Sequence, residues 1–208
     1  MGKLCCTILA GFWLLLLTGC ATVSPAGFTE DQQVMIRNGD AQTPMRVFKI
    51  TSESDSVLLR TASKPVRVDK DDPLLELFVD RLYATVRDSQ SLGLGIAAPQ
   101  VGILKNIIWV QRLDKTEEDM PFEVYLNPEI VEYSAEKQIN REGCLSIPNR
   151  SAECERAQTI VLEYDKMDGS HARETISDFT AVIFQHEVDH LNGILYLDHL
   201  AEHRRARP

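Results

Sequence analysis

The sequence predicts an α+β domain in which mixed or antiparallel β-sheets pack around a C-terminal, metal-binding helix. Three observations indicate this fold class. Apolar residues recur at three- and four-residue intervals over 73–89, as in an amphipathic helix. Segments between 106 and 176 are rich in β-branched and aromatic residues, as strands are. A second helical pattern, over 179–192, carries two histidines four residues apart.

Length and charge limit the classes of function. The chain has 208 residues, of which 44% are hydrophobic, and this is sufficient for one domain with a substantial core. Its formal net charge is −9. General binding to nucleic acid depends on attraction between basic groups and phosphates, so we expect no nucleic acid partner.

The first 20 residues have the pattern of a secretory signal. The apolar run 8–17 follows a lysine and is too short to cross a membrane comfortably. It leads into LTGC at 17–20, which resembles the lipobox of bacterial lipoproteins, whose cysteine is lipidated. We therefore expect a lipid anchor on Cys20 and a location in the bacterial cell envelope. Ala21, in place of aspartate, favours the outer membrane over the inner. An uncleaved anchor and an ordinary signal peptide are the alternatives.

The segment after the signal is interpreted as a linker. Residues 21–44 are polar and contain prolines and glycines, which predicts a tether to a catalytic domain at 45–203. The composition of 45–50 predicts a short strand. The first long helix is expected to begin at Asp72-Pro73, because aspartate can cap a helix and proline suits its first position.

The strands and the last helix follow in order. The segments with strand composition are 106–111, 123–128, 157–165 and 171–176. A turn sequence, MDGS, separates the last two and predicts a hairpin. Ser177 and Asp178 are candidate caps for the helix 179–192, and Gly193 is its expected terminator.

The last helix predicts metal chemistry. His186 and His190 are four residues apart, so both imidazoles project from one face and can bind one metal ion. Glu187 is rotated by about 100° from His186, where it can reach a water molecule rather than the ion. This is the arrangement of H-E-x-x-H sites, with two ligands and a general base. The alternative is a surface helix with solvated histidines.

A third protein ligand is needed, and spacing alone does not identify it. Cys5 and Cys6 would leave with the signal, so the mature domain keeps Cys144 and Cys154. These two can form a disulfide, or one can bind the metal while the other lies in the core. The other candidates are acidic residues, His171, which we expect to be solvated, and His199.

Three segments together resemble a known family. They are GLGIAAPQ at 93–100, EGCLS at 142–146 and QHEVDH at 185–190. In this order they resemble the signature motifs of the peptide deformylases. The stretches 54–66 and 190–200 are also similar to that family, so the resemblance covers roughly residues 45–200. It implies the deformylase fold and the hydrolysis of N-formyl groups from formyl-methionyl peptides, with release of formate.

The resemblance also implies a metal site. Cys144, His186 and His190 would bind one ion per chain, with water as the fourth ligand. Ferrous iron is the usual ion of the family, and Zn²⁺, Ni²⁺ or Co²⁺ can occupy such sites. Glu187 would take a proton from the water and give it to the leaving amine.

Further roles follow from the matching positions. The Gln100 side chain and the Leu145 backbone N–H would stabilise the oxyanion. The substrate peptide would pair with the chain like an added strand. The substrate-binding residues would be Leu94, Gly95, Gly143 and Ile183. Glu142 would pair with Arg156 to fix the metal loop. We expect the enzyme to be a monomer.

Some features depart from the family. Ile96 replaces a usual leucine and Cys154 a usual valine. The lipoprotein signal is the largest departure, because deformylases act on nascent chains in the cytoplasm. A formylated peptide outside the cytoplasm is therefore the expected substrate. The alternatives are another envelope metallopeptidase or amidohydrolase, and an inactive lipoprotein that binds metal or peptide.

Overall fold

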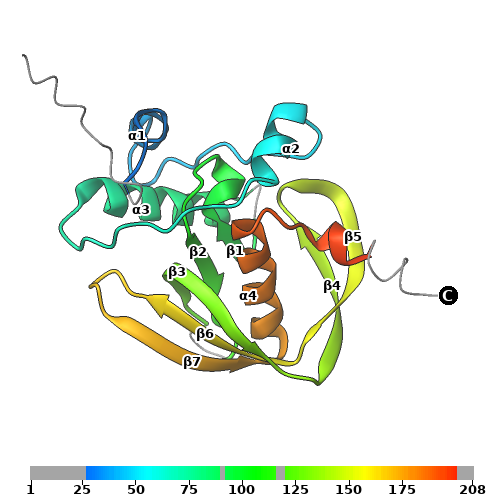
Figure 1. The fold of residues 1–208 in the computed structure, drawn as a ribbon. Coiled ribbons are helices and arrows are strands. Elements are labelled where there is room, and N and C mark those ends of the chain that lie inside the picture. Colours follow the sequence, from blue (N-terminus) through cyan, green and yellow to red (C-terminus); the bar gives the residue numbers. More distant parts are fainter. Residues whose placement is uncertain (1–26, 90–91, 116–119, 201–208) are drawn as a thin grey trace, which may run out of the picture.

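A computed structural model of the chain describes residues 27–89, 92–115 and 120–200. The strands of this part of the chain form two antiparallel sheets (Figure 1). One sheet has the order β1-β2-β3-β6-β7 and the other pairs β4 with β5. The bounds are Gly95–Ala97 for β1, Ile107–Gln111 for β2, Phe122–Tyr133 for β3, Lys137–Cys144 for β4, Ile147–Ala157 for β5, Thr159–Asp165 for β6 and His171–Ser177 for β7.

The C-terminal helix α4, Asp178–Leu191, lies between the two sheets (Figure 1) and contacts strands of both. The predicted α+β fold is therefore confirmed. Ser177 occupies the N-cap position, but its hydroxyl pairs with Thr159 Oγ1 at 2.9 Å and not with the helix. Gly193 ends the helix region with φ +71°, and a Cβ there would lie 2.5 Å from the Arg60 carbonyl oxygen. Only glycine fits this close approach.

Helix α3, Pro73–Arg87, covers the other face of the large sheet. Asp72 caps it by accepting a hydrogen bond from Leu74 N at 2.9 Å, as predicted. Strand β2 has apolar residues on both faces because both are covered. Its Ile107 packs with α3, whereas Ile108 packs with α4. The hairpin β6–β7 was also predicted correctly, with Asp165 opposite His171.

The interpretation of residues 21–44 as a tether was wrong for the part that the structure describes. Helix α1, Glu30–Arg37, packs on α3 and buries Ile36 completely. The buried Arg81 of α3 donates to the Met35 and Ile36 carbonyl oxygens at 3.0 and 2.8 Å. These bonds satisfy carbonyls that a helix end leaves unpaired. The predicted signal and Cys20 lie outside the described residues.

The predicted strand at 45–50 is also absent. This segment is irregular, although Phe48 N donates to Gln100 O at 2.7 Å and Ile50 N to Ser146 O at 3.0 Å. The described part of the chain contains two further short helices, the α-helix α2, Glu53–Leu59, and the 3₁₀ helix η1, Ala98–Val101.

No helix among the described residues has the length and apolar character needed to span a membrane.

Candidate active site

Helix α4 carries the paired histidines and anchors them to the sheet. The side chain of Gln185 forms two hydrogen bonds with the backbone of Ala157, both 3.0 Å long. They hold the helix against the end of β5. His190 is 1% exposed and Glu187 is 4% exposed, so these side chains face the interior and not solvent. The alternative of a solvated surface helix is thereby excluded.

Cys144 reaches the histidines from the second sheet. It ends β4 at a register irregularity, where the regular pairing with β5 breaks. Its Sγ lies 3.1 Å from His190 Nε2, and ligand atoms of Cys144, His186 and His190 all lie within 4.8 Å of one another. Burial opposes ionisation of the thiol, but the charge of His190 and hydrogen bonds with both imidazoles hold the pKa of Cys144 well below its usual value.

A chain of polar groups orients His186. Its Nδ1 lies 2.8 Å from Glu142 Oε2, which leaves the other ring nitrogen for the site. Arg156 then binds both oxygens of Glu142, at 2.7 and 3.0 Å, and donates to Asp189 at 2.6 Å. The predicted Glu142–Arg156 pair is present. Asp189 also accepts from His199 at 2.7 Å, so His199 belongs to this outer network and not to the ligand group.

Gln100 is held in one orientation by the backbone. Its Oε1 accepts from Ala97 N at 2.8 Å, which closes the turn of η1. Its Nε2 therefore points to the other side, 3.6 Å from Cys144 Sγ and 3.4 Å from Ser146 Oγ. Because the carbonyl end is already bonded, the amide presents only its donor end to the site.

Glu187 lies against the glycine of β1. A Cβ on Gly95 would be 2.6 Å from Glu187 Oε1, so the carboxylate occupies the space that a side chain would fill. Burial raises the pKa of Glu187 to about 7, against the opposing charges of His186 and His190. Its Oε2 has no hydrogen-bond partner within the described ranges. A buried carboxyl group of this kind is suited to accept and release a proton near neutral pH.

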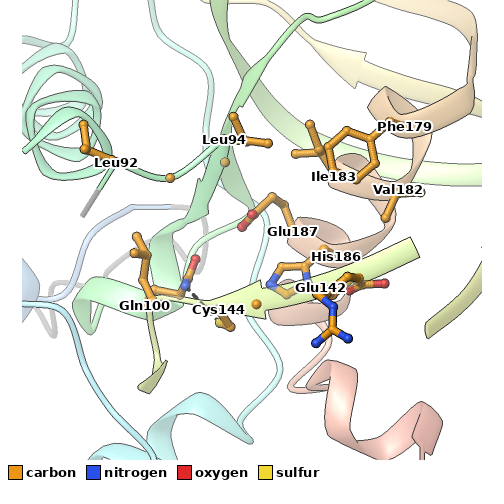
Figure 2. Close-up of a pocket in the computed structure, with 15 residues that line it drawn as sticks. Leu92, Leu94, Gln100, Glu142, Cys144, Phe179, Val182, Ile183, His186 and Glu187 are labelled. Carbon is orange, nitrogen blue, oxygen red and sulfur yellow. Dashed lines mark hydrogen bonds and ion pairs between the residues drawn. The ribbon is translucent and has the colours of Figure 1, made fainter. Parts of the chain in front are cut away.

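These groups surround a cavity of about 360 Å³. Figure 2 shows Gln100 and Cys144 at one end and an apolar group formed by Leu94, Ile183 and Phe179 at the other, with Glu187 between them. The cavity thus combines a cluster of metal-ligating and proton-transferring groups with an apolar compartment, which is the usual composition of a substrate site.

A family model described as polypeptide deformylase matches residues 47–206. The chain belongs to this family. It is therefore an enzyme, a metal-dependent hydrolase that removes the N-formyl group from peptides. The predicted family and activity are confirmed.

Similar proteins of known family match about three quarters of this chain. The chain is 39% identical over 154 residues to a peptide deformylase of Finegoldia magna, covering 74% of this chain and 90% of the relative. A Met-Ala-Ser-bound crystal structure of the class I type b peptide deformylase from Acinetobacter baumannii matches with a TM-score of 0.67 and 34% identity, covering 76% and 99% of the two chains. The peptide deformylase of Thermotoga maritima matches with a TM-score of 0.65 and 32% identity, covering 75% and 97%.

The structure places the other predicted deformylase residues as follows. Leu94, Gly95, Gly143, Leu145 and Ile183 line the cavity, so all the expected substrate-binding positions border one space. Sequence reasoning did not assign three further lining residues to the site, Leu92, Arg141 and Phe179. Phe179 lies one helical turn before Ile183, and the helical spacing predicts that the two share a face, but it does not show that this face borders a cavity.

The structure distinguishes between the candidates for the third metal ligand. Cys154 is 1% exposed and packs with Ile147, Leu195 and Tyr196. Both Cys144 and Cys154 are free thiols. His171 is on the surface, 2.9 Å from Asp165 Oδ1, as its position beside a turn indicated. Among the described residues, the group of ligand atoms within 4.8 Å of one another consists of Cys144, His186 and His190.

Proposed function

We propose that the cavity binds a formyl-methionyl peptide and that Cys144, His186 and His190 hold the ion. One observation carries this proposal: the ligand atoms of the three residues lie within 4.8 Å of one another, beside a buried carboxyl group. One thiolate and two imidazoles suit a borderline-soft divalent ion. When bound, such an ion supplies Lewis acidity toward a carbonyl oxygen and lowers the pKa of water.

The proton in this proposal is moved by Glu187. Its pKa of about 7 permits the carboxylate to accept a proton and the acid to return it to the leaving amine. Gln100 Nε2 and the Leu145 backbone N–H would donate to the oxygen that becomes negative when the formyl carbon is attacked. The bond between Gln100 Oε1 and Ala97 N supports this role, because it fixes the amide before substrate arrives.

The peptide is proposed to lie along β1. This strand is at the edge of its sheet, where an extended peptide can add a further strand. The methionine side chain would enter the apolar end formed by Leu94, Val182 and Ile183. The Met-Ala-Ser complex of the Acinetobacter baumannii relative supports a site of this size and chemistry.

Ferrous iron and an envelope location complete the proposal. The signal-like sequence before residue 20 supports export, and a lipidated Cys20 would tether the enzyme to the outer membrane. The substrate would then be a formylated peptide outside the cytoplasm. A Cys20→Ser chain should lose lipid in mass spectrometry and move from the membrane to the soluble fraction. If the wild-type chain carried no lipid and the Cys20→Ser chain stayed with the membrane, the proposed anchor would be wrong.

The catalytic proposal is tested by formate release. The full chain is purified without oxygen, loaded in parallel with ferrous iron, Zn²⁺, Ni²⁺ or Co²⁺, and given a formyl-methionyl tripeptide, with Glu187→Ala beside it. We expect turnover in the wild type, highest with iron, and loss of most turnover in the variant at equal metal content. Cleavage of unformylated peptides would indicate a peptidase. Bound metal without any turnover would indicate a binding protein.

A further inference from the structure

Arg141 of β4 lines the same cavity as Cys144 and Glu187. We infer that Arg141 binds a carboxylate of the substrate, so that the enzyme favours formylated peptides with a negative charge about two residues beyond the formyl-methionine. This inference rests on the proposed function of the cavity as the peptide site. It adds the charge class of the substrate, which the deformylase reaction itself leaves open.

The guanidinium of Arg141 is not neutralised by the protein. Within the described ranges, no carboxylate oxygen lies within 4 Å of it, although Glu153 is opposite on β5. Its hydrogen bond goes to the uncharged Ser151 Oγ, at 3.1 Å. Arg112 and Arg156, by contrast, each pair with acidic side chains. An unpaired cation on the cavity wall is notable in a chain of net charge −9.

The other ionisable groups of the cavity have partners or a chemical task. Glu142 is bound on both oxygens by Arg156 and also contacts His186. His186 and Glu187 belong to the reaction centre. Arg141 is therefore the lining residue whose charge remains available to a ligand. A guanidinium matches the planar fork of a carboxylate better than an ammonium group does.

The spacing along β4 places the backbone of Arg141 at the distance where a short peptide ends. Arg141 precedes Cys144 by three residues, which separates their backbones by at most about 10 Å at 3.3 Å per residue. An extended substrate with its formyl group near Cys144 covers the same distance by its third residue. Alternation along the strand also puts Arg141 on the same face as Gly143, which lines the cavity.

This geometry suits a free tripeptide or a peptide with an acidic side chain near its start. A free tripeptide carries its own terminal carboxylate at the third residue. A long chain has no terminal carboxylate there, and it would need aspartate or glutamate instead. The inferred substrates are thus short, released formyl peptides and acidic ones, in agreement with an enzyme outside the cytoplasm.

The test compares three peptides on the metal-loaded full chain. They are formyl-Met-Ala-Ser with a free carboxylate, the same peptide as its C-terminal amide, and formyl-Met-Ala-Lys amide. The quantity measured is kcat/KM for formate release, in 20 mM and 500 mM salt. The variants are Arg141→Gln, which removes the charge, and Arg141→Glu, which reverses it. Arg150→Gln is the matched control, because Arg150 is an exposed arginine of β5 that does not line the cavity.

We expect the wild type to favour the carboxylate over the amide by about fivefold in low salt, the upper range for an exposed ion pair, and less in high salt. Arg141→Gln should bring this ratio to about one, Arg141→Glu should favour the lysine peptide, and Arg150→Gln should keep the wild-type ratio. Turnover of all three peptides without preference, or an equal change in Arg150→Gln, would overturn the role of Arg141. Failure to hydrolyse even the amide peptide would instead overturn the proposed function.

Discussion

Replacing Gly95 with alanine should displace the catalytic carboxyl group without removing any catalytic atom. The new Cβ would lie 2.6 Å from Glu187 Oε1, 2.9 Å from Cγ and 3.0 Å from Cδ. An ordinary contact begins at 3.4 Å, so the carboxylate must retreat by about 0.8 Å. Glu187 is 4% exposed and has little room to do so without changing its position relative to the substrate.

The magnitude follows from the sensitivity of proton transfer to position. A misplacement of about 1 Å in a reacting group costs about a hundredfold in rate, which corresponds to about 2.7 kcal/mol of transition-state stabilisation. We therefore expect Gly95→Ala to lower kcat/KM by about two orders of magnitude. Metal content should not change, because Gly95 is not among the Cys144, His186 and His190 ligand group.

The assay is formate release from a formyl-methionyl peptide at equal metal loading, with the variants Gly95→Ala, Glu187→Ala and the double variant. If Gly95 acts through Glu187, adding Gly95→Ala to Glu187→Ala should reduce the rate little further. Additive losses in this cycle, or near-wild-type activity of Gly95→Ala, would refute the reasoning. Loss of metal from Gly95→Ala would show that the substitution disrupts the site as a whole.

Further substitutions separate metal binding, catalysis and stability. Glu187→Ala should keep its metal and fold, measured by elemental analysis and circular dichroism, and lose about 10²–10⁴ in kcat; metal loss would show that Glu187 is a ligand. Cys144→Ala should lose metal on dialysis whereas Cys154→Ala retains it, and the reverse would exchange their roles. Arg156→Met removes the cationic partner of two largely buried carboxylates, Glu142 and Asp189, and should lower the free energy of unfolding in urea by about 3–5 kcal/mol. Ile36→Ala should lower it by about 2–4 kcal/mol, and no change would contradict the packing of α1.

Local signals in the sequence predicted the elements that local chemistry determines. The Asp72 cap of α3 and the turn of the β6–β7 hairpin depend on neighbouring residues, and both are present. Helix α1 also has such a signal, a capping box between Thr29 and Gln32, which could have corrected its interpretation as a tether. Strands β4 and β5 carry many charged, exposed side chains, so their pairing has no clear hydrophobic period.

The part of the site that lies on one helix could also be predicted from local sequence. His186, Glu187 and His190 share one helix, so their spacing alone indicates their geometry. Cys144 and Cys154 lie on two strands of one sheet, and only the tertiary fold decides which thiol faces α4. The charge of Arg141 gave no signal, since an exposed arginine on a strand is ordinary until a cavity is found beside it.

The polar chain behind His186 has a consequence for the charge balance of the buried centre. With neutral imidazoles, as metal ligation requires, the Cys144 thiolate and the carboxylates of Glu142 and Asp189 face one guanidinium, that of Arg156. Two negative charges thus remain uncompensated in the interior while Glu187 keeps its proton, and a third appears when Glu187 releases it. A bound divalent cation would therefore bring this centre to electrical neutrality with Glu187 protonated. The net charge of the buried groups thus links the charge of the bound ion to the protonation state of Glu187.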